Sequence, residues 1–318
     1  MCNPGSVESR PALKTSARAH AFTVDLEDWF HGIPISAARQ ETTSSRIERG
    51  LFPLLDLLAE HRTYATFFVL GSLADQRPDL IKRIVGMGHE IACHGWSHKP
   101  VYKMDRRRFR LETERAKDTV EQIIEAPVAG YRAPYFSIVS QTMWALEELA
   151  SLGFQYDSSI FPFRAWRYGI RDFPPRPTCI RTSSGLITEF PIAVQKTLGI
   201  TMPNSGGAYF RLYPYALSAR NFRSAARRRE YAVFYIHPWE LDPTHPRIAF
   251  DWRAWITHYA NLRTTRRKLE RLLADFRFEP LRSWRSFGAG LSLSRASEEV
   301  VEADRGCCVR TAADRGAA

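Results

Sequence analysis

The chain has 318 residues, of which 44% are hydrophobic and 25% are charged, a composition typical of a globular protein with a sizeable core. No segment approaches the ~20 consecutive apolar residues that a membrane-spanning helix needs, and five irregularly spaced cysteines exclude a disulfide framework and favour a reducing compartment. The net charge of +11 favours an anionic neighbour, but the arginines are scattered, so nucleic acid is not expected as a partner.

The chain is predicted to begin with a leader and a short strand. Residues 1–20 are polar and lack the apolar central region of a signal peptide, so we expect a disordered leader and a cytoplasmic or inner-membrane-associated protein. A β-prone run at 21–25 follows. It ends in an acidic cluster that consists of Asp25, Glu27 and Asp28.

Strand-like and helix-like segments then alternate along the chain. Apolar, β-branched and aromatic runs predict strands at 64–71, 89–92, 129–135, 155–159, 231–236 and 276–279. Apolar residues at helical spacing predict helices at 46–61, 78–87, 105–125, 141–152, 215–229 and 253–274. This alternation is typical of an α/β fold with a largely parallel sheet.

The alternation breaks between Ile160 and Tyr213, where prolines crowd and Gly206-Gly207 indicates a turn. We expect this stretch, about 160–213, to be an insertion within a single domain that spans 21–285. The last residues, 286–318, are small, charged and poor in apolar side chains, which predicts a disordered tail.

Polar residues that can carry chemistry stand at the ends of four predicted strands. They are the acidic cluster at Asp25, Glu27 and Asp28, the pair His94 and His98, Arg132, and His237. In a parallel α/β barrel the carboxyl ends of the strands share one face, and that face carries the site. The four groups are therefore expected to lie together.

The residue types in these groups predict metal-assisted hydrolysis of an amide or ester. His94 and His98 are four residues apart, so both imidazoles can reach one point from a helical turn. With a carboxylate they form a ligand set for zinc or another divalent ion, which activates water and polarises a carbonyl. A second carboxylate can take the proton of the water, and a separate histidine can protonate the leaving group.

Several motifs stand in a characteristic order, namely TVDLEDWF (23–30), ATFFVLG (65–71), HEIACHGWSH (89–98), GYRAPYFS (130–137), YDSSIFP (156–162) and HPWELDP (237–243). In this order they resemble the polysaccharide deacetylase superfamily, that is carbohydrate esterase family 4 or the NodB-homology proteins. The first and the last two are similar to the subgroup found with bacterial exopolysaccharide loci and exosortase systems. The likeness covers about Ala21 to Phe278. It implies a distorted (β/α) barrel of about seven parallel strands.

The resemblance also implies a role for each matching residue. Those roles are metal ligand for His94 and His98, general base for Asp25, orientation of that base for Arg132, a backbone N–H toward the oxyanion for Tyr135, and general acid for His237. Trp96, Tyr135 and Trp239 flank these motifs, and we expect them to contact sugar rings, with packing in the aromatic core as the alternative. Glu240 and Asp242 are expected to form caps or salt bridges rather than to orient His237.

The first motif departs from the family pattern. Leu26 stands where most of the family has the aspartate that binds the metal. Glu27 and Asp28 are both candidates for the third ligand, because strand alternation puts Glu27 on the side of Asp25 while a turn can reverse that order.

The expected function is removal of N-acetyl groups from hexosamine units of a bacterial exopolysaccharide or its lipid-linked precursor. The expected cofactor is a divalent metal, zinc first and cobalt or nickel as alternatives. A basic surface would suit a peripheral contact with a membrane. The alternatives are a hydrolase of the same fold that cleaves a cyclic ureide or imide, and a non-catalytic glycan-binding protein.

Overall fold

The structure is a computed structural model that describes residues 19–33, 43–163, 165, 168–197, 200–228, 230–249 and 251–284, together with the backbone of 301–303 and 306–310. Residues 1–18 of the predicted leader and most of the predicted tail therefore lie outside the described residues. None of the helices in the described part is long and apolar enough to cross a bilayer.

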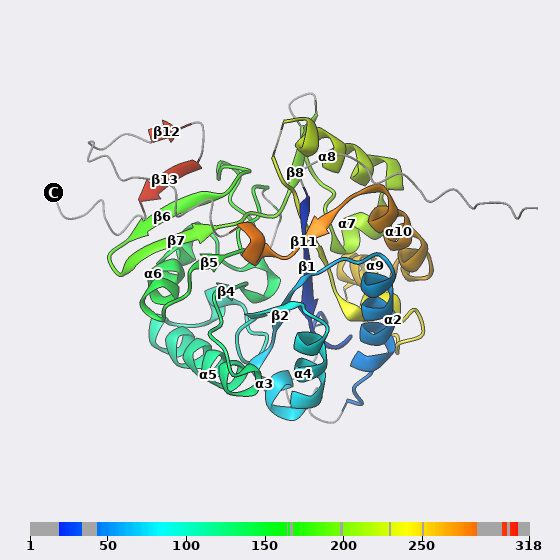
Figure 1. Cartoon of the computed structure of the whole chain (residues 1–318), viewed down its shortest axis with the longest axis horizontal. Coiled ribbons are helices and arrows are strands. Elements are labelled where there is room, and N and C mark those ends of the chain that lie inside the picture. Colours follow the sequence, from blue (N-terminus) through cyan, green and yellow to red (C-terminus); the bar gives the residue numbers. More distant parts are fainter. Residues whose placement is uncertain are drawn as a thin grey trace, which may run out of the picture.

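A curled, mostly parallel sheet forms the centre of the molecule (Figure 1). Seven parallel strands follow in the order β10 (Val233–Ile236), β1 (His20–Leu26), β2 (Thr66–Val69), β3 (Glu90–Cys93), β4 (Gly130–Tyr131), β5 (Tyr156–Asp157) and β7 (Gly185–Glu189). A further short strand, β11 (Phe278–Glu279), pairs with the start of β1. The predicted α/β fold with a distorted barrel of about seven parallel strands is confirmed, and the sheet forms a half-barrel.

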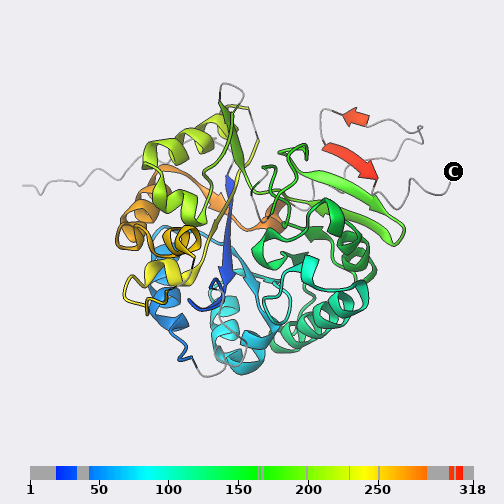
Figure 2. The same ribbon diagram turned by 180° about the vertical axis from the view of Figure 1, so that it is seen from behind.

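Helices cover the outer face of the sheet (Figures 1 and 2). They are α2 (Ile47–Glu60), α3 (Gly71–Gln76), α4 (Pro78–Gly86), α5 (Arg106–Ile124), α6 (Trp144–Ser151), α7 (Gly207–Leu212), α8 (Tyr215–Arg227), α9 (Trp252–Tyr259) and α10 (Leu262–Asp275). In α2 the apolar residues at helical spacing are buried, so one stripe faces the sheet. Strands such as β2 are buried on both faces, which explains their continuous apolar sequence.

Short 3-10 helices follow several strands. They are η1 (Val101–Lys103), η2 (Pro134–Phe136), η3 (Ser140–Thr142), η4 (Pro238–Leu241) and η5 (Leu281–Trp284). The last one closes the amino end of the half-barrel. There the buried carboxylate of Glu90 accepts hydrogen bonds from the Thr66 hydroxyl at 2.6 Å, the Tyr156 hydroxyl at 3.0 Å and the Arg282 N–H at 2.8 Å.

The predicted insertion contributes strands to the sheet. Strand β6 (Thr178–Thr182) forms an antiparallel hairpin with β7, and β8 (Val194–Thr197) forms another with β9 (Ile200–Pro203). The half-barrel is open between its two outer parallel strands, β7 and β10, and the chain segment that connects them runs along this opening. The Ile192 N–H donates to the Ile160 carbonyl at 3.1 Å, and Gly206 forms a bridge with Tyr235 of β10.

Elements near the carboxyl end of the chain differ from the sequence-based expectation. The helix predicted at 253–274 is divided into α9 and α10, because Ala260 is extended and Asn261 adopts a left-handed conformation with φ of 57°. Asparagine tolerates this conformation, and the Asn261 side chain donates to the Arg211 carbonyl at 3.2 Å. In the region of the predicted tail, β12 (Val301–Ala303) and β13 (Gly306–Arg310) pair with each other, and β13 runs parallel to β6.

Candidate active site

Three buried side chains that are typical metal ligands meet at the carboxyl end of the sheet. The ligand atoms of Glu27, His94 and His98 all lie within 4.8 Å of one another. Glu27 follows β1 and the two histidines follow β3, so the parallel sheet brings them to one end of the barrel. Imidazole and carboxylate donors at this separation suit zinc or another divalent ion.

The ring of His94 is oriented by the backbone. Its Nδ1 atom lies 2.7 Å from the carbonyl oxygen of Arg132, and because a carbonyl can only accept, the Nδ1–H donates. The Nε2 atom therefore keeps the lone pair that a metal requires. Burial lowers the pKa of His94 to about 4, so the ring is neutral, as a metal ligand must be.

Glu27 and His98 approach each other in a way that fits a cation between them. Oε2 of Glu27 lies 2.8 Å from Nε2 of His98, yet this buried oxygen has no hydrogen-bond partner among the described residues. A buried polar atom without a partner is costly unless something satisfies it, and a bound ion would do so. Burial raises the pKa of Glu27, but His98 and His237 outweigh it and hold that pKa well below its usual range, so the carboxylate is ionised.

Asp28, the other candidate for the third ligand, lies apart from this group. Its carboxylate accepts hydrogen bonds from the Ser45 hydroxyl, from the Arg46 N–H at 3.0 Å and from the Trp29 N–H at 2.8 Å. It therefore holds the start of α2, where a carboxylate is favourable. The reason lies at the end of β1, where the Glu27 N–H donates to the Asp25 carbonyl at 3.0 Å and turns the chain.

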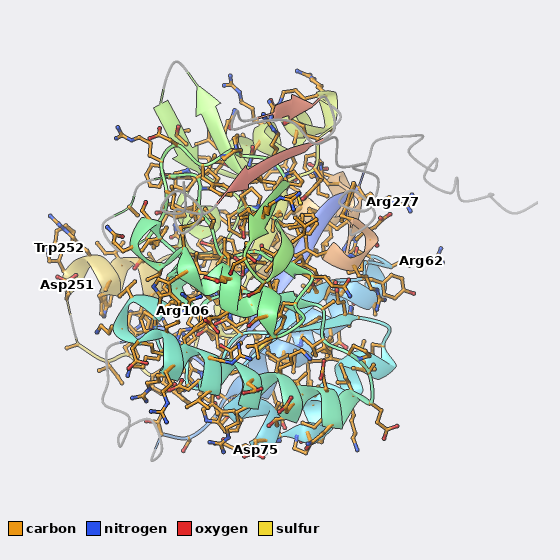
Figure 3. The ribbon with its side chains drawn as sticks, turned by 90° about the vertical axis from the view of Figure 1, so that its left-hand side faces the viewer. Arg62, Asp75, Arg106, Asp251, Trp252 and Arg277 are labelled. Atoms are coloured by element: carbon orange, nitrogen blue, oxygen red, sulfur yellow. The ribbon has the colours of Figure 1, made fainter. Side chains whose placement is uncertain are left out.

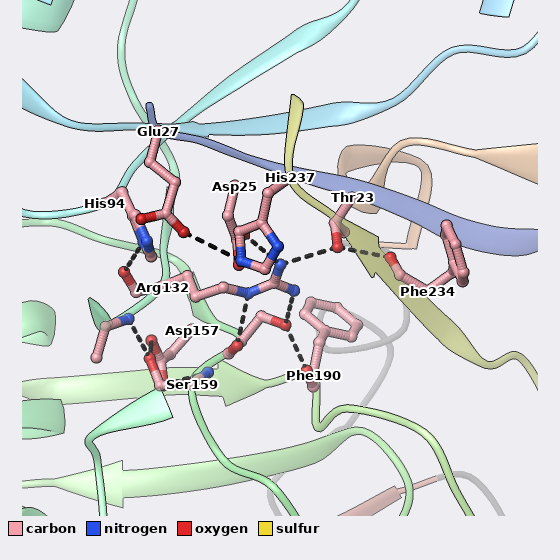
Figure 4. A network of polar contacts seen from close by, with 12 residues as sticks. Thr23, Asp25, Glu27, His94, Arg132, Asp157, Ser159, Phe190, Phe234 and His237 are labelled. Atoms are coloured by element: carbon pink, nitrogen blue, oxygen red, sulfur yellow. Dashed lines mark hydrogen bonds and ion pairs between the residues drawn. The ribbon is translucent and has the colours of Figure 1, made fainter. Parts of the chain in front are cut away.

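The expected base, Asp25, is paired with a fully buried arginine. Nη1 of Arg132 donates to Oδ1 of Asp25 at 2.7 Å and to the Thr23 hydroxyl at 2.8 Å (Figure 4). The same guanidinium donates through Nε to the Ser158 carbonyl at 2.9 Å and through Nη2 to the Ser158 hydroxyl at 2.8 Å. These bonds fix the guanidinium in one position, so it can fix Asp25.

His237 faces the same carboxylates from β10. Its Nε2 atom lies 3.0 Å from Oε1 of Glu27 and 3.8 Å from Oδ2 of Asp25. Its Nδ1 atom lies 2.8 Å from Oε1 of Glu240, and the buried Arg211 donates to the other oxygen of that carboxylate at 2.6 Å. Burial lowers the pKa of His237, but Glu27 and Glu240 outweigh it and raise that pKa to about 10.

Tyr135 stands beside the metal-ligand group. Its ring centroid lies 4.6 Å from that of His98, and its hydroxyl donates to the His31 carbonyl at 2.7 Å. His98 and Tyr135 have positive φ values of 53° and 57°, in a region that side-chain-bearing residues adopt at a cost of about 1–3 kcal/mol. Such strain is characteristic of sites whose surroundings hold the backbone in place.

The two tryptophans expected to contact substrate pack against other side chains. The ring centroid of the partly buried Trp96 lies 3.5 Å from the guanidinium carbon of Arg115. The ring of Trp239 is 7% exposed and stacks on His237 and His258, with centroids at 5.1 and 4.2 Å. These contacts favour the packing alternative for both residues, and a role in sugar binding stays a prediction.

Sequence reasoning missed three residues that hold the site, and it favoured a cap or salt bridge for a fourth, Glu240, which forms a salt bridge and also holds His237. Thr23 and Ser158 fix Arg132, while Glu240 and Arg211 fix His237. Ser158 lies in the YDSSIFP motif and Glu240 lies in the HPWELDP motif, so a signal existed for both. Arg211 lies in α7, within the stretch 160–213 that showed no regular pattern, and nothing in the sequence distinguishes it from other arginines.

Two family models match the chain. A model of the polysaccharide deacetylase family matches residues 48–156, and a model of a domain of unknown function, DUF3473, matches residues 158–285. Among curated proteins, a chitooligosaccharide deacetylase of Sinorhizobium fredii is 36% identical over 114 residues, which are 34% of this chain and 53% of the relative. A peptidoglycan-N-acetylglucosamine deacetylase of Bacillus cereus is 32% identical over 96 residues, 30% of this chain and 35% of the relative. The chain thus spans about half or less of these relatives.

Solved structures share the fold over nearly the whole chain. A protein of Mycobacterium smegmatis assigned as a polysaccharide deacetylase superimposes with a TM-score of 0.58 at 18% identity, covering 93% of this chain and 99% of that one. Puue allantoinase superimposes with a TM-score of 0.56 at 16% identity, covering 90% of this chain and 95% of that one. At these identities the likeness concerns the fold alone.

Proposed function

Because the chain belongs to the polysaccharide deacetylase family, we propose that it is a metal-dependent N-deacetylase of a bacterial exopolysaccharide or its lipid-linked precursor. The observation that carries the proposal is the meeting of Glu27, His94 and His98 opposite the carboxylate of Asp25 and the imidazole of His237. This arrangement offers a metal site, a base and an acid within one small space, which amide hydrolysis requires.

Glu27, His94 and His98 would hold the divalent ion, which we propose to be zinc, with cobalt or nickel as substitutes. When bound, such an ion supplies a Lewis acid that lowers the pKa of water to about 7 and polarises the acetyl carbonyl. The N–H of Nδ1 on His94 is engaged by the Arg132 carbonyl, so Nε2 is the atom that faces the site.

Asp25 takes the proton from the attacking water. Arg132 holds one carboxylate oxygen of Asp25, Oδ1, at 2.7 Å, so the other oxygen is left for the water. The buried guanidinium also holds Asp25 in one orientation, which a base needs before the substrate arrives.

His237 protonates the departing amine. Its Nδ1 atom is held by Glu240, so Nε2 points at the carboxylates and hence at the reacting centre. The backbone N–H of Tyr135, beside His98, would stabilise the negative charge that develops on the carbonyl oxygen. The acid and the base thus approach the substrate from different strands, β10 and β1.

A hydrolase of a cyclic ureide is the alternative, since the same fold also occurs in Puue allantoinase. We prefer the sugar substrate, because the deacetylase relatives share 32–36% sequence identity over their matched segments, whereas the allantoinase shares 16%. Both reactions cleave a C–N bond by adding water to a carbonyl, so they need the same residues and only the substrate separates them.

The proposal is tested by acetate release from N-acetylglucosamine oligomers. The zinc-loaded protein is expected to release acetate, to lose the activity with a chelator, and to regain it with zinc, cobalt or nickel. Glu27→Gln is expected to empty the metal site and lower the activity by at least about 100-fold. Asp28→Asn is the control, which should keep its metal while the loss of the α2 contacts costs about 1 kcal/mol of stability.

Metal content is measured on the purified variants, so the ligand assignment is read independently of turnover. A folded, metal-loaded protein that cleaves allantoin but releases no acetate from a broad panel of N-acetylated glycans would refute the sugar substrate. Loss of metal from Asp28→Asn with retention in Glu27→Gln would refute the ligand assignment.

A further inference from the structure

Helix α9 has one face buried beside the site and one face exposed. Trp252 is 64% exposed and Ile256 is 39% exposed, and their spacing of four residues puts both on the same side of the helix. On the other side His258 stacks on Trp239, the residue that also stacks on His237. Within the described residues, α9 thus leaves two large apolar side chains largely exposed, with the Arg253 guanidinium carbon 5.2 Å from the Trp252 ring.

This exposed face lies at the same end of the molecule as the proposed active site. Figure 3 shows Trp252 projecting from one end, while Arg62 and Arg277 lie at the opposite end. Arg62 precedes β2 and Arg277 precedes β11, so their end is the amino end of the parallel strands. Trp252 therefore projects from the carboxyl end, where Glu27 and the site histidines lie.

Exposed arginines gather on α10, which follows α9 in the chain, and on α8, which packs against α10. Figures 1 and 2 show α7 to α10 together on one side of the sheet. The exposed arginines of α8 and α10, which we call the basic face, are Arg220, Arg223, Arg227, Arg263, Arg266, Arg267 and Arg271. Two of them have acidic partners, with Arg223 3.6 Å from Asp275 and Arg266 3.0 Å from Glu270. Among the described residues, Arg220, Arg227, Arg263 and Arg267 form no ion pair.

We propose that Trp252, Ile256 and the basic face bind an anionic lipid surface. An indole ring is favourable at the boundary between water and hydrocarbon, and an apolar helix face inserts at that depth. Arginines near the surface attract anionic headgroups. A soluble polyanion would account for the arginines but not for the exposed Trp252 and Ile256, so the combination favours a membrane.

This proposal extends the proposed function and rests on it for the identity of the substrate. A glycan attached to a lipid carrier would emerge from the membrane at the end of the molecule that holds the site. Binding to the surface requires neither the metal nor the reaction, so the two proposals can fail separately.

The test is cosedimentation of the full chain with vesicles of equal parts phosphatidylglycerol and phosphatidylcholine, and with vesicles of phosphatidylcholine alone. Binding is expected to the anionic vesicles and to weaken in 0.5 M salt. The double variant W252A/I256A is expected to bind at least about tenfold more weakly, because the apolar area is lost. The double variant R220Q/R267Q is expected to lose about fivefold for each arginine removed.

Matched controls come from α5, on the other side of the sheet in Figure 1. Leu111 is 56% exposed and Arg107 is exposed, so Leu111→Ala and Arg107→Gln remove comparable groups and are expected to bind as the unaltered protein does. His94→Ala is expected to abolish acetate release while vesicle binding is retained, which separates this proposal from the catalytic one.

Three outcomes would overturn the proposal. They are no binding to anionic vesicles, equal binding by W252A/I256A and the unaltered protein, and binding to inorganic polyphosphate that is as strong as vesicle binding and insensitive to W252A/I256A. The last outcome would assign the basic face to a soluble polyanion.

Discussion

His237 is positioned by a chain of two buried charges. Glu240 accepts from both the backbone N–H of His237 at 3.0 Å and its Nδ1 at 2.8 Å, and Arg211 donates to the other oxygen of Glu240. Removing one partner of a buried ion pair lowers the stability of a protein strongly. An intact buried pair is tolerated when the other N–H groups of its cation also find acceptors. Arg211 meets this condition, because its terminal nitrogens donate to the carbonyls of Ala260 and Thr257.

Glu240→Gln is expected to lower kcat by about 10–100-fold with little change in KM, because the amide can no longer stabilise the protonated ring of His237. The melting temperature should also fall, since Arg211 loses its counter-charge. Steady-state kinetics of acetate release, at a temperature where both proteins are folded, measures the effect.

Asp242→Asn is the matched control for Glu240→Gln. Asp242 lies two residues further on, but its carboxylate pairs with Arg46 at 2.7 Å and does not contact His237. The kcat of Asp242→Asn is expected to stay within about twofold of that of the unaltered protein, because Asp242 does not contact the imidazole ring of His237. Equal losses in the two variants would mean that Glu240 serves only the local backbone.

At the scale of elements, α2 is pressed against the backbone that carries His237. A Cβ atom at Gly50 would stand 1.9 Å from the carbonyl oxygen of Pro238, the first residue of η4. The glycine is therefore required by close approach and not by its backbone angles. Asp28 anchors the start of the same helix. The two neighbouring acidic residues thus have separate roles, because Glu27 lies with the site histidines and Asp28 positions α2.

Gly50→Ala is expected to destabilise the protein by about 1–3 kcal/mol, as overpacking does, and to lower kcat by displacing η4. Gly86→Ala in α4 is the control, because a Cβ there meets nothing within 4 Å. Helix propensity predicts a gain of about 0.5–1 kcal/mol for Gly86→Ala. Urea denaturation measures both changes, and an unaltered midpoint for Gly50→Ala would contradict the close contact.

At the scale of the whole molecule, buried neutral histidines couple stability to pH, and His20 and His89 are two of them that lie outside the site. Nδ1 of His20 accepts the Ala232 N–H and Nδ1 of His89 accepts the Ala65 N–H, both at 3.2 Å, so a proton on either nitrogen would displace a backbone bond. Burial lowers the pKa of each ring from 6.5 to about 4. The unfolded chain therefore binds these protons first as the pH falls.

The stability that the two neutral rings confer is complete above pH 6.5 and is lost as the pH falls toward 4. At about pH 5.5, each of the two histidines is expected to lower the free energy of unfolding by about 1 kcal/mol relative to neutral pH. Urea titrations at pH 7.0 and about pH 5.5 measure this loss. His20→Asn should show a smaller loss over the same interval, and an unchanged loss would exclude His20 as a contributor.

The position of the site was predictable because it depends on strand ends. Short apolar runs that stop at a polar residue mark those ends, as Asp25, His94 and His237 do, and a parallel sheet brings such ends together. The fold class followed from the same alternation. The helix break at Asn261 was not predictable, because the apolar spacing of α9 continues into α10 without interruption.

The details of the site depend on contacts that a sequence does not display. Glu27 rather than Asp28 joins the histidines because of one turn at the end of β1. The packing of Trp96 against Arg115 and of Trp239 against His258 is likewise not visible in the sequence. The pairing of Arg211 with Glu240 joins two segments whose spacing carries no periodic signal.

The central place of β1 has a consequence for synthesis on the ribosome. One edge of β1 pairs with β2, but the other pairs with β10 and β11, which lie more than 200 residues later in the chain. At about 5–20 residues per second, that edge stays open for roughly 10–40 s after β1 has been made. The nascent chain must therefore shield Phe22 and Val24 from intermolecular pairing until its last third emerges. Only then does Asp25, the proposed base, meet His237, the proposed acid.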